Sequence, residues 1–397
     1  MELGAYQNYI GGEWTNGAAS ETFDVINPAT EEVVATVPNA VPEDIKAAID
    51  AATAVGERWA DTLAAERARI LHQAAERMRQ DVERLARIMT IEEGKPLAEA
   101  RGEINYAASF LDWFAKEAPR MYGDTIPSSS PDKRILVIKR PVGIAAAITA
   151  WNFPAAMITR KLGPALAAGC TMIIKPSELT PLLALEFARI FEEVGLPKGV
   201  LSVVVGTNAP ALVKVIMDDF RVRKVSFTGS TEVGKILMHQ AADTAKRVWL
   251  ELGGHAPFTV FEDADLDAAV AGAVTCKMRG MGETCVSPNR IYVQRSVYDR
   301  FVQHLAERMG CMQVGNGMED GVSVGPLIEP AGLEKEQRHV ADAVRMVDVG
   351  QYGPVANLIR DCRLDGASPV GVDTSWAPGN GGVWMASPDL WYQDDRW

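Results

Sequence analysis

The chain has 397 residues, of which 47% are hydrophobic, enough apolar material for one large core or two ordinary ones. Lysine and arginine total 40 against 52 acidic residues, and the resulting charge of −12 argues against binding to nucleic-acid phosphates or an anionic membrane. The five cysteines lack CxxC spacing, and we find neither a signal peptide nor a long apolar span. We therefore expect a cytoplasmic protein with a small-molecule partner.

The N-terminal part alternates between β-type and helical sequence. Residues 7–37 carry short β-type runs separated by turn residues, which predicts a small β entry segment. From residue 42 to about 118, apolar residues recur three and four apart, which predicts amphipathic helices divided near Gly94 and Pro96. A β-rich stretch follows at residues 134–139.

Strands and helices then alternate regularly. Helical stretches separate apolar runs, which are typical of buried parallel strands, at residues 141–150, 171–175, 200–205 and 224–228. This repetition predicts an α/β fold with a doubly wound, Rossmann-type sheet. We assign residues 1–250 to the entry segment and this cofactor domain, with a bridging β segment near residues 120–140.

A second α/β unit is expected at residues 251–344, where helices at 266–279 and 297–309 flank a strand at 290–294. We interpret it as an incomplete catalytic domain. Residues 345–397 contain four of the nine tryptophans and show no helical or strand period. We assign no fold to this tail.

The first candidate site follows the strand at residues 224–228. Gly229 and Ser230 open a helix there, and the free N–H groups of a helix start favour a pyrophosphate. The spacing departs from GxGxxG, and glycine with serine at a helix start is also ordinary capping chemistry.

The second candidate site is Lys175 with Glu178, at the carboxyl end of a predicted strand, where open α/β sheets bind ligands. The two side chains can hold ribose hydroxyls, or they can be a solvated pair beside a proline turn. If Glu178 faces the adenosine ribose, its charge repels a 2′-phosphate, which favours NAD over NADP.

Three further residues carry potential chemistry. Cys285 lies in a loop between elements, where a thiol can act as nucleophile, although a lone cysteine is usually a small buried hydrophobe. Glu251 precedes two glycines and can activate a water or simply cap a helix. Asn152 follows an apolar strand and can stabilise an oxyanion or form an Asx turn.

Together these motifs resemble the aldehyde dehydrogenase superfamily in content and order, from Trp-Asn-Phe-Pro at residues 151–154 to the Cys285 loop. The resemblance covers roughly residues 7–344 and implies NAD as cofactor, with NADP possible, no metal, and a homodimer or homotetramer. It implies cofactor contacts by Trp151, Lys175, Ser177, Glu178, Gly206, Phe227, Thr228, Gly229, Ser230 and Leu252.

The chain is similar to succinate-semialdehyde dehydrogenases along residues 101–110, 122–126 and 154–161. This similarity implies that Arg160 and Arg279 hold the carboxylate of an acidic aldehyde, as a guanidinium pair can. Ordinary surface arginines are the alternative. The substrate can equally be another acidic semialdehyde, such as glutarate or 2-oxoglutarate semialdehyde.

The resemblance also implies a mechanism. The Cys285 thiolate attacks the aldehyde carbon, and the Asn152 amide and the Cys285 backbone N–H meet the oxyanion. Hydride leaves to the nicotinamide, and Glu251 deprotonates the water that hydrolyses the thioester.

Four departures from the family pattern stand out. One is that the C-terminal strand that completes the oligomer in the family is not recognisable here. Glu283 replaces the usual glutamine, and we expect its charge to point away from the thiol. Ser287 replaces the second cysteine that forms a regulatory disulfide in some relatives. The Glu-x-Phe-Gly-Pro motif survives at best at residues 350–354, with Gly350 in the glutamate position. A deletion followed by a frame change would produce such a truncated or scrambled tail, and it would leave either an enzyme or an inactive NAD-binding remnant.

Overall fold

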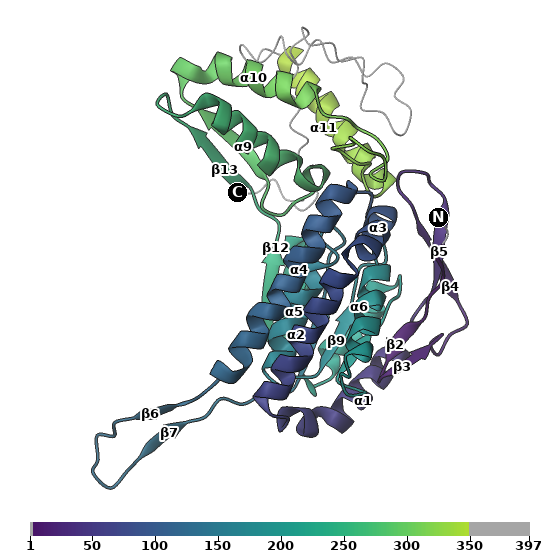
Figure 1. The fold of residues 1–397 in the computed structure, drawn as a ribbon, viewed down its shortest axis with the longest axis vertical. Coiled ribbons are helices and arrows are strands. Elements are labelled where there is room, and N and C mark those ends of the chain that lie inside the picture. Colours follow the sequence, from purple (N-terminus) through teal and green to yellow (C-terminus); the bar gives the residue numbers. More distant parts are fainter. Residues whose placement is uncertain (1–2, 349–397) are drawn as a thin grey trace.

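The computed structural model describes residues 3–348, and Figure 1 shows their arrangement. Of the tail placed at residues 345–397, the first four residues belong to helix α11 (Pro330–Asp348). The part from residue 349 onward, with the 350–354 motif, lies outside the described residues. Among the residues described, no helix is long and apolar enough to cross a membrane.

The centre of the molecule is a seven-stranded sheet in the order β12-β11-β8-β9-β10-β2-β3. The five strands from β12 to β10 pair in parallel, which confirms the predicted doubly wound α/β sheet. They are β8 (Ile144–Ile148), β9 (Met172–Lys175), β10 (Leu201–Val203), β11 (Val222–Gly229) and β12 (Arg247–Leu252). The chain runs outward from β8 in both directions, so the sheet has a topological switch point between β8 and β11.

Helices cover both faces of this sheet, which explains why β8 is buried along its whole length. One core joins the sheet to α5 (Ala156–Ala167) and α6 (Leu182–Glu193). The other joins it to α1 (Pro42–Ala60), α7 (Ala209–Asp218) and α8 (Thr231–Ala242). The small side chains of β8, Ala145 to Ala147, let these helices pack closely against the sheet.

The N-terminal β segment adds strands that the sequence could not assign to a sheet. The hairpin β2 (Asn8–Ile10) and β3 (Glu13–Thr15) turns at Gly11 and Gly12, whose φ angles of 64° and 92° suit glycine. Its strand β2 pairs antiparallel with β10. A separate sheet contains β1 (Gly4–Ala5), β5 (Val33–Pro38) and β4 (Thr22–Ile26).

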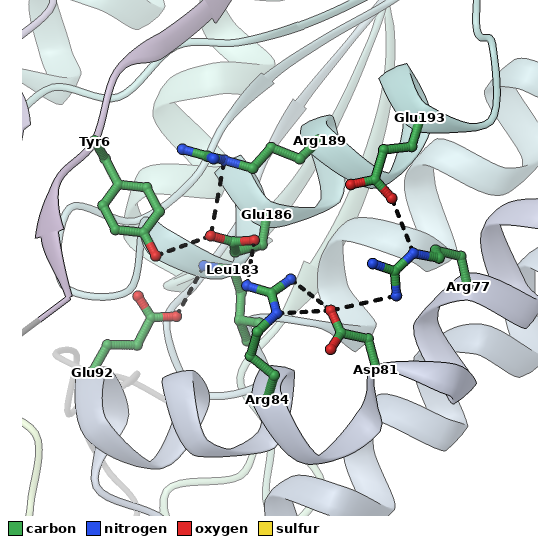
Figure 2. Close-up of polar contacts among 9 residues, drawn as sticks. All are labelled: Tyr6, Arg77, Asp81, Arg84, Glu92, Leu183, Glu186, Arg189 and Glu193. Atoms are coloured by element: carbon green, nitrogen blue, oxygen red, sulfur yellow. Dashed lines mark hydrogen bonds and ion pairs between the residues drawn. The ribbon is translucent and has the colours of Figure 1, made fainter. Parts of the chain in front are cut away.

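Three helices form a layer over α5 and α6: α2 (Ala64–Gln80), α3 (Val82–Glu93) and α4 (Leu97–Glu117), which η1 (Ala118–Arg120) extends. Figure 2 shows how polar contacts hold this layer. The buried carboxylate of Glu186 accepts from the Tyr6 hydroxyl at 3.0 Å and pairs with Arg84 at 2.7 Å. Glu92 accepts from the backbone N–H groups of Leu182 and Leu183, the first turn of α6.

The remaining elements form a smaller unit and a projecting arm (Figure 1). Strands β13 (Ala256–Val260) and β14 (Pro288–Val293) pair in parallel beside α9 (Leu266–Met278) and α10 (Tyr298–Gly310), with their own core. The short helices η2 (Arg279–Gly282) and η3 (Arg295–Val297), and helix α11 (Pro330–Asp348), complete this part. The antiparallel pair β6 (Asp124–Ile126) and β7 (Ile135–Val137) stands away from the body.

The structure differs from the sequence interpretation in one domain boundary and in one additional strand. Glu251, taken as the start of the second unit, lies inside β12 of the large sheet, because this strand pairs with β11 as far as Leu252. The second unit contains an additional strand, β13, that the sequence analysis did not identify. Its alternation of buried and exposed residues is short and weak.

Candidate active site

The residues predicted to contact a cofactor follow the carboxyl ends of the parallel strands. Trp151 follows β8, Lys175 ends β9, Gly206 follows β10, and Leu252 ends β12. Phe227, Thr228 and Gly229 end β11, and Ser230 follows them directly. Because open α/β sheets bind ligands at this edge, the topology brings these residues to one side of the sheet.

The start of α8 has the features of a phosphate site and of an ordinary cap. The Ser230 Oγ accepts from the Val233 N–H at 3.2 Å, so this side chain caps the helix. The N–H groups of the first turn still point out of the helix. The Thr228 Oγ1 is buried and has no partner among the described residues. A β-carbon at Gly229 would lie 2.3 Å from the Phe227 ring, so any larger residue there would require the ring to move.

Lys175 and Glu178 form an ion pair at the end of β9. The Lys175 Nζ, on a buried side chain, donates to Glu178 Oε2 at 2.8 Å. The nearby Ser177 Oγ accepts from the Leu179 N–H at 3.3 Å, which is an ordinary turn contact. The ion pair offsets the carboxylate charge that was expected to repel a 2′-phosphate.

Cys285 lies in a tight turn after a strained segment. The Ser287 N–H donates to the Thr284 carbonyl at 3.1 Å, which places Cys285 inside the turn, partly exposed. Just before it, Met281 adopts a φ of 55° although it is a buried non-glycine residue. Such a conformation costs about 1–3 kcal/mol and persists only where surrounding contacts enforce it.

Asn152 connects the end of β8 to this turn. Its side chain is buried, and its Nδ2 donates to the carbonyl oxygen of Glu283 at 2.8 Å. An amide nitrogen carries two hydrogens, so one remains for another acceptor. The buried Asn152 Oδ1 has no partner among the described residues. The structure thus brings the oxyanion candidate to the loop that carries the thiol.

Arg160 and Arg279 approach the thiol from two different elements, α5 and the start of η2. Burial raises the pKa of the Cys285 thiol, Arg160 and Arg279 oppose this rise, and Glu251 adds to it. Arg160 lies over the Phe110 ring at 5.7 Å, and Arg279 lies over the Phe153 ring at 4.7 Å. Neither guanidinium forms an ion pair within the described part of the chain.

Glu251 reaches the site from β12. Its carboxylate, half-buried, accepts from the Trp249 Nε1 at 3.4 Å, and its charge affects the pKa of Cys285. The loop after it also touches the cysteine turn, because a β-carbon at Gly254 would lie 3.5 Å from the Cys285 carbonyl oxygen. The structure therefore brings Cys285, Asn152, Glu251, Arg160 and Arg279 into one region.

Glu283 is buried, with 3% of its surface accessible, and it is not among the charged groups that act most strongly on the Cys285 thiol. Burial raises its pKa well above the usual value, and Glu93 adds to the rise. The other charges that act on it most strongly are those of Glu336, Lys95 and Glu329. Burial therefore favours the protonated form of this carboxyl group over the charged form.

Sequence analysis missed three buried ionisable residues around the site: Lys95, Glu103 and Lys161. Lys95 donates to the Asn152 carbonyl oxygen at 2.9 Å and pairs with Glu103 at 2.6 Å. Burial lowers the pKa of Lys161 to about 8, and Arg160 contributes to the decrease. Lys161 directly follows Arg160 in α5, and this adjacency was the only indication in the sequence that Lys161 lies near the site.

A cavity of about 280 Å³ lies elsewhere, between the N-terminal segment, α3 and α6. Its lining includes Tyr6, Arg84, Arg189 and Glu186, and none of the predicted site residues. Glu186 pairs with both of these arginines, which accounts for the charges that face the cavity. We therefore locate the candidate active site at the cysteine turn and not in this cavity.

Comparison with known proteins identifies the family. Residues 14–351 match the model of the aldehyde dehydrogenase family. The chain is 52% identical to a glutarate-semialdehyde dehydrogenase of Pseudomonas putida, over 86% of this chain and 71% of that protein. It is also 52% identical to the NADP(+) succinate-semialdehyde dehydrogenase of Escherichia coli, over 85% and 70%. An E. coli NADP-dependent enzyme of known structure superposes with a TM-score of 0.85 at 51% identity, over 86% of this chain and 71% of that one.

Proposed function

Because this chain belongs to the aldehyde dehydrogenase family, we propose that it oxidises a carboxylate-bearing aldehyde to the acid with a nicotinamide cofactor. The observation that carries the substrate class is the pair Arg160 and Arg279. Both act electrostatically on the Cys285 thiol, and the contacts of their guanidiniums among residues 3–348 are with the rings of Phe110 and Phe153 and with Met157 rather than with a carboxylate. Two unneutralised guanidiniums beside a nucleophile fit a substrate that supplies the anion.

Succinate semialdehyde is the substrate that we propose first, and glutarate semialdehyde is the second candidate. Relatives at 52% identity are named for each of them. The two aldehydes differ by one methylene, which changes selectivity by only ~1–3 kcal/mol. The ratio of kcat/KM values across aldehydes of increasing chain length decides between them.

The fit of a dinucleotide rests on the carboxyl edge of the large sheet. The N–H groups of the first turn of α8 and the unpartnered Thr228 hydroxyl are the donors that a pyrophosphate would use there. Lys175 and Glu178, which pair with each other at the end of β9, would hold the ribose hydroxyls. A bound nicotinamide supplies the hydride acceptor. We propose NAD as the preferred form, with NADP accepted because Lys175 offsets the Glu178 charge.

The chain's own residues account for the other steps. Cys285 forms a bond from its sulfur to the aldehyde carbon, and the positive charges of Arg160 and Arg279 favour the thiolate that this requires. The free hydrogen of the Asn152 amide and the Cys285 N–H stabilise the oxyanion. After the carbon has been oxidised to the thioester, Glu251 takes a proton from water, and the hydroxide releases the acid.

We also propose that the protein assembles into a homodimer or homotetramer in the cytoplasm. The hairpin arm β6–β7 supports assembly, because it stands away from the body with exposed apolar side chains. Leu136 is 72% exposed and Ile138 77% exposed. Light scattering of the purified protein measures the number of copies.

The test of the function is the formation of reduced nicotinamide by purified protein given NAD and succinate semialdehyde. We expect turnover that Cys285→Ala abolishes while the dissociation constant for NAD stays within a few-fold. Binding of NAD without turnover in a folded wild-type protein would instead identify an inactive remnant.

A further inference from the structure

A buried group of charges lies behind the Asn152 loop and has no role in the mechanism above. Lys95 lies between α3 and α4 with 1% of its surface accessible. Its Nζ lies 2.6 Å from Glu103 Oε2 and 3.6 Å from Glu93 Oε1. Both carboxylates are also buried, so the ammonium is enclosed by protein.

Lys95 and Glu103 hold the two ends of one short segment. The Lys95 Nζ donates to the Asn152 carbonyl oxygen at 2.9 Å. Glu103 Oε1 accepts from the N–H groups of Ala155 and Ala156 at 2.9 and 3.2 Å. Between them, the Lys95 ammonium lies 4.4 Å from the centre of the Phe153 ring. This one ion pair therefore holds both ends of the backbone from residue 152 to residue 156, in addition to the first hydrogen bonds of α5.

The orientation of the Asn152 amide depends on that backbone. With the main chain fixed by Lys95, the side chain reaches across to the Glu283 carbonyl oxygen at 2.8 Å, two residues before the nucleophile. We propose that Lys95, paired with Glu103, is the positioning residue that aligns the Asn152 amide with the oxyanion. The inference rests on the proposed function, since it assigns how that function's oxyanion donor is oriented.

Stability alone does not explain a lysine at this position. A buried ion pair loses about as much free energy in desolvation as it gains, and apolar side chains of similar volume would stabilise the fold at least as well. Lys95 nevertheless remains charged: burial lowers its pKa, but Glu103 and Glu93 more than compensate and hold it above its usual range. A fixed cation supplies a directional bond to the Asn152 carbonyl oxygen, which an apolar side chain cannot make.

The test is a double-mutant cycle of Lys95→Met and Asn152→Ala. A misplacement of about 1 Å can lower kcat about 100-fold, so Lys95→Met should lower kcat about 10- to 100-fold. KM for the aldehyde should change only a few-fold. In the Asn152→Ala background, Lys95→Met should lower kcat little further, because both substitutions remove the same hydrogen bond to the oxyanion.

Lys246→Met is the matched control. Lys246 is also a buried lysine, and its Nζ donates to the Val222 carbonyl oxygen at 2.8 Å, at the opposite edge of the sheet from the site. We expect it to lower stability and leave kcat within a few-fold. If Lys95→Met does not fold, Glu103→Gln replaces it in the cycle, since the amide oxygen still accepts from Ala155 and Ala156.

Hydrogen–deuterium exchange gives a readout that does not need turnover. Exchange at residues 152–156 should accelerate in Lys95→Met and not in Lys246→Met. A wild type without aldehyde oxidation would refute the proposed function, while exchange would still test the positioning. The inference would be overturned if Lys95→Met left the exchange or kcat unchanged. It would also be overturned if the loss of kcat in the double variant equalled the product of the two single losses.

Discussion

Replacement of Arg160 or Arg279 by methionine tests the substrate class most directly. Methionine keeps the packing of Arg160 against Phe110 and of Arg279 against Phe153 while it removes the charge. A hydrogen bond to a charged group contributes ~1.5–3 kcal/mol, so each variant should lose about 10- to 150-fold in kcat/KM for succinate semialdehyde. We expect the larger loss for Arg160, which is half-buried, because solvent screens the exposed Arg279.

The assay compares succinate semialdehyde with butanal, which has the same carbon chain without the carboxylate. The kcat/KM for butanal should fall much less, because butanal has no carboxylate and the substitution then acts only through the pKa of the Cys285 thiol. Since Arg160 and Arg279 both lower the pKa of Cys285, their loss should shift the pH dependence of kcat/KM for both aldehydes toward higher pH. Arg300→Met, at an exposed position in α10, is the control. Equal losses of kcat/KM with the two aldehydes would show that the arginines do not bind the substrate carboxylate.

Three further predictions follow from other residues of the site. Glu251→Gln should give a burst of about one reduced nicotinamide per site and then stall, because the thioester forms but is not hydrolysed; steady turnover would exclude Glu251 as the base. Glu283→Gln should flatten the pH dependence of the melting temperature. Above the ordinary glutamate pKa near 4.5, the folded protein keeps a proton that the unfolded chain has released, so wild-type stability falls as pH rises; an unchanged slope contradicts this. Glu178→Ser should increase kcat/KM with NADP relative to NAD, and an unaltered ratio would mean that Glu178 does not face the ribose.

The sequence by itself determined the fold class and the identity of the candidate residues. Apolar runs at residues 141–150 and 171–175 predicted buried parallel strands, and the structure has β8 and β9 inside them. This worked because strand burial and helix periodicity are local properties of the chain. The order of the motifs then indicated the family, and the match over residues 14–351 confirmed it.

Sequence could not show which charges meet in space. Arg160 and Arg279 are 119 positions apart, and nothing but the similarity to relatives joined them before the fold placed both within electrostatic reach of one thiol. The same holds for the contact of Lys95 with Asn152, because a long-range hydrogen bond leaves no periodic signal in the chain. The sequence of a short hairpin likewise does not determine which sheet edge it joins, so the pairing of β2 with β10 could not be predicted.

Glu283 shows most clearly the difference between what the sequence determines and what the tertiary structure determines. The sequence supplied a carboxylate two residues before the nucleophile, and a charge that points away was the simplest expectation. The tertiary structure encloses this side chain beside Glu93 under α11, where burial raises the pKa of the carboxyl group. Residue type sets which protonation states exist, but only packing sets the local dielectric and the neighbouring charges that select between them.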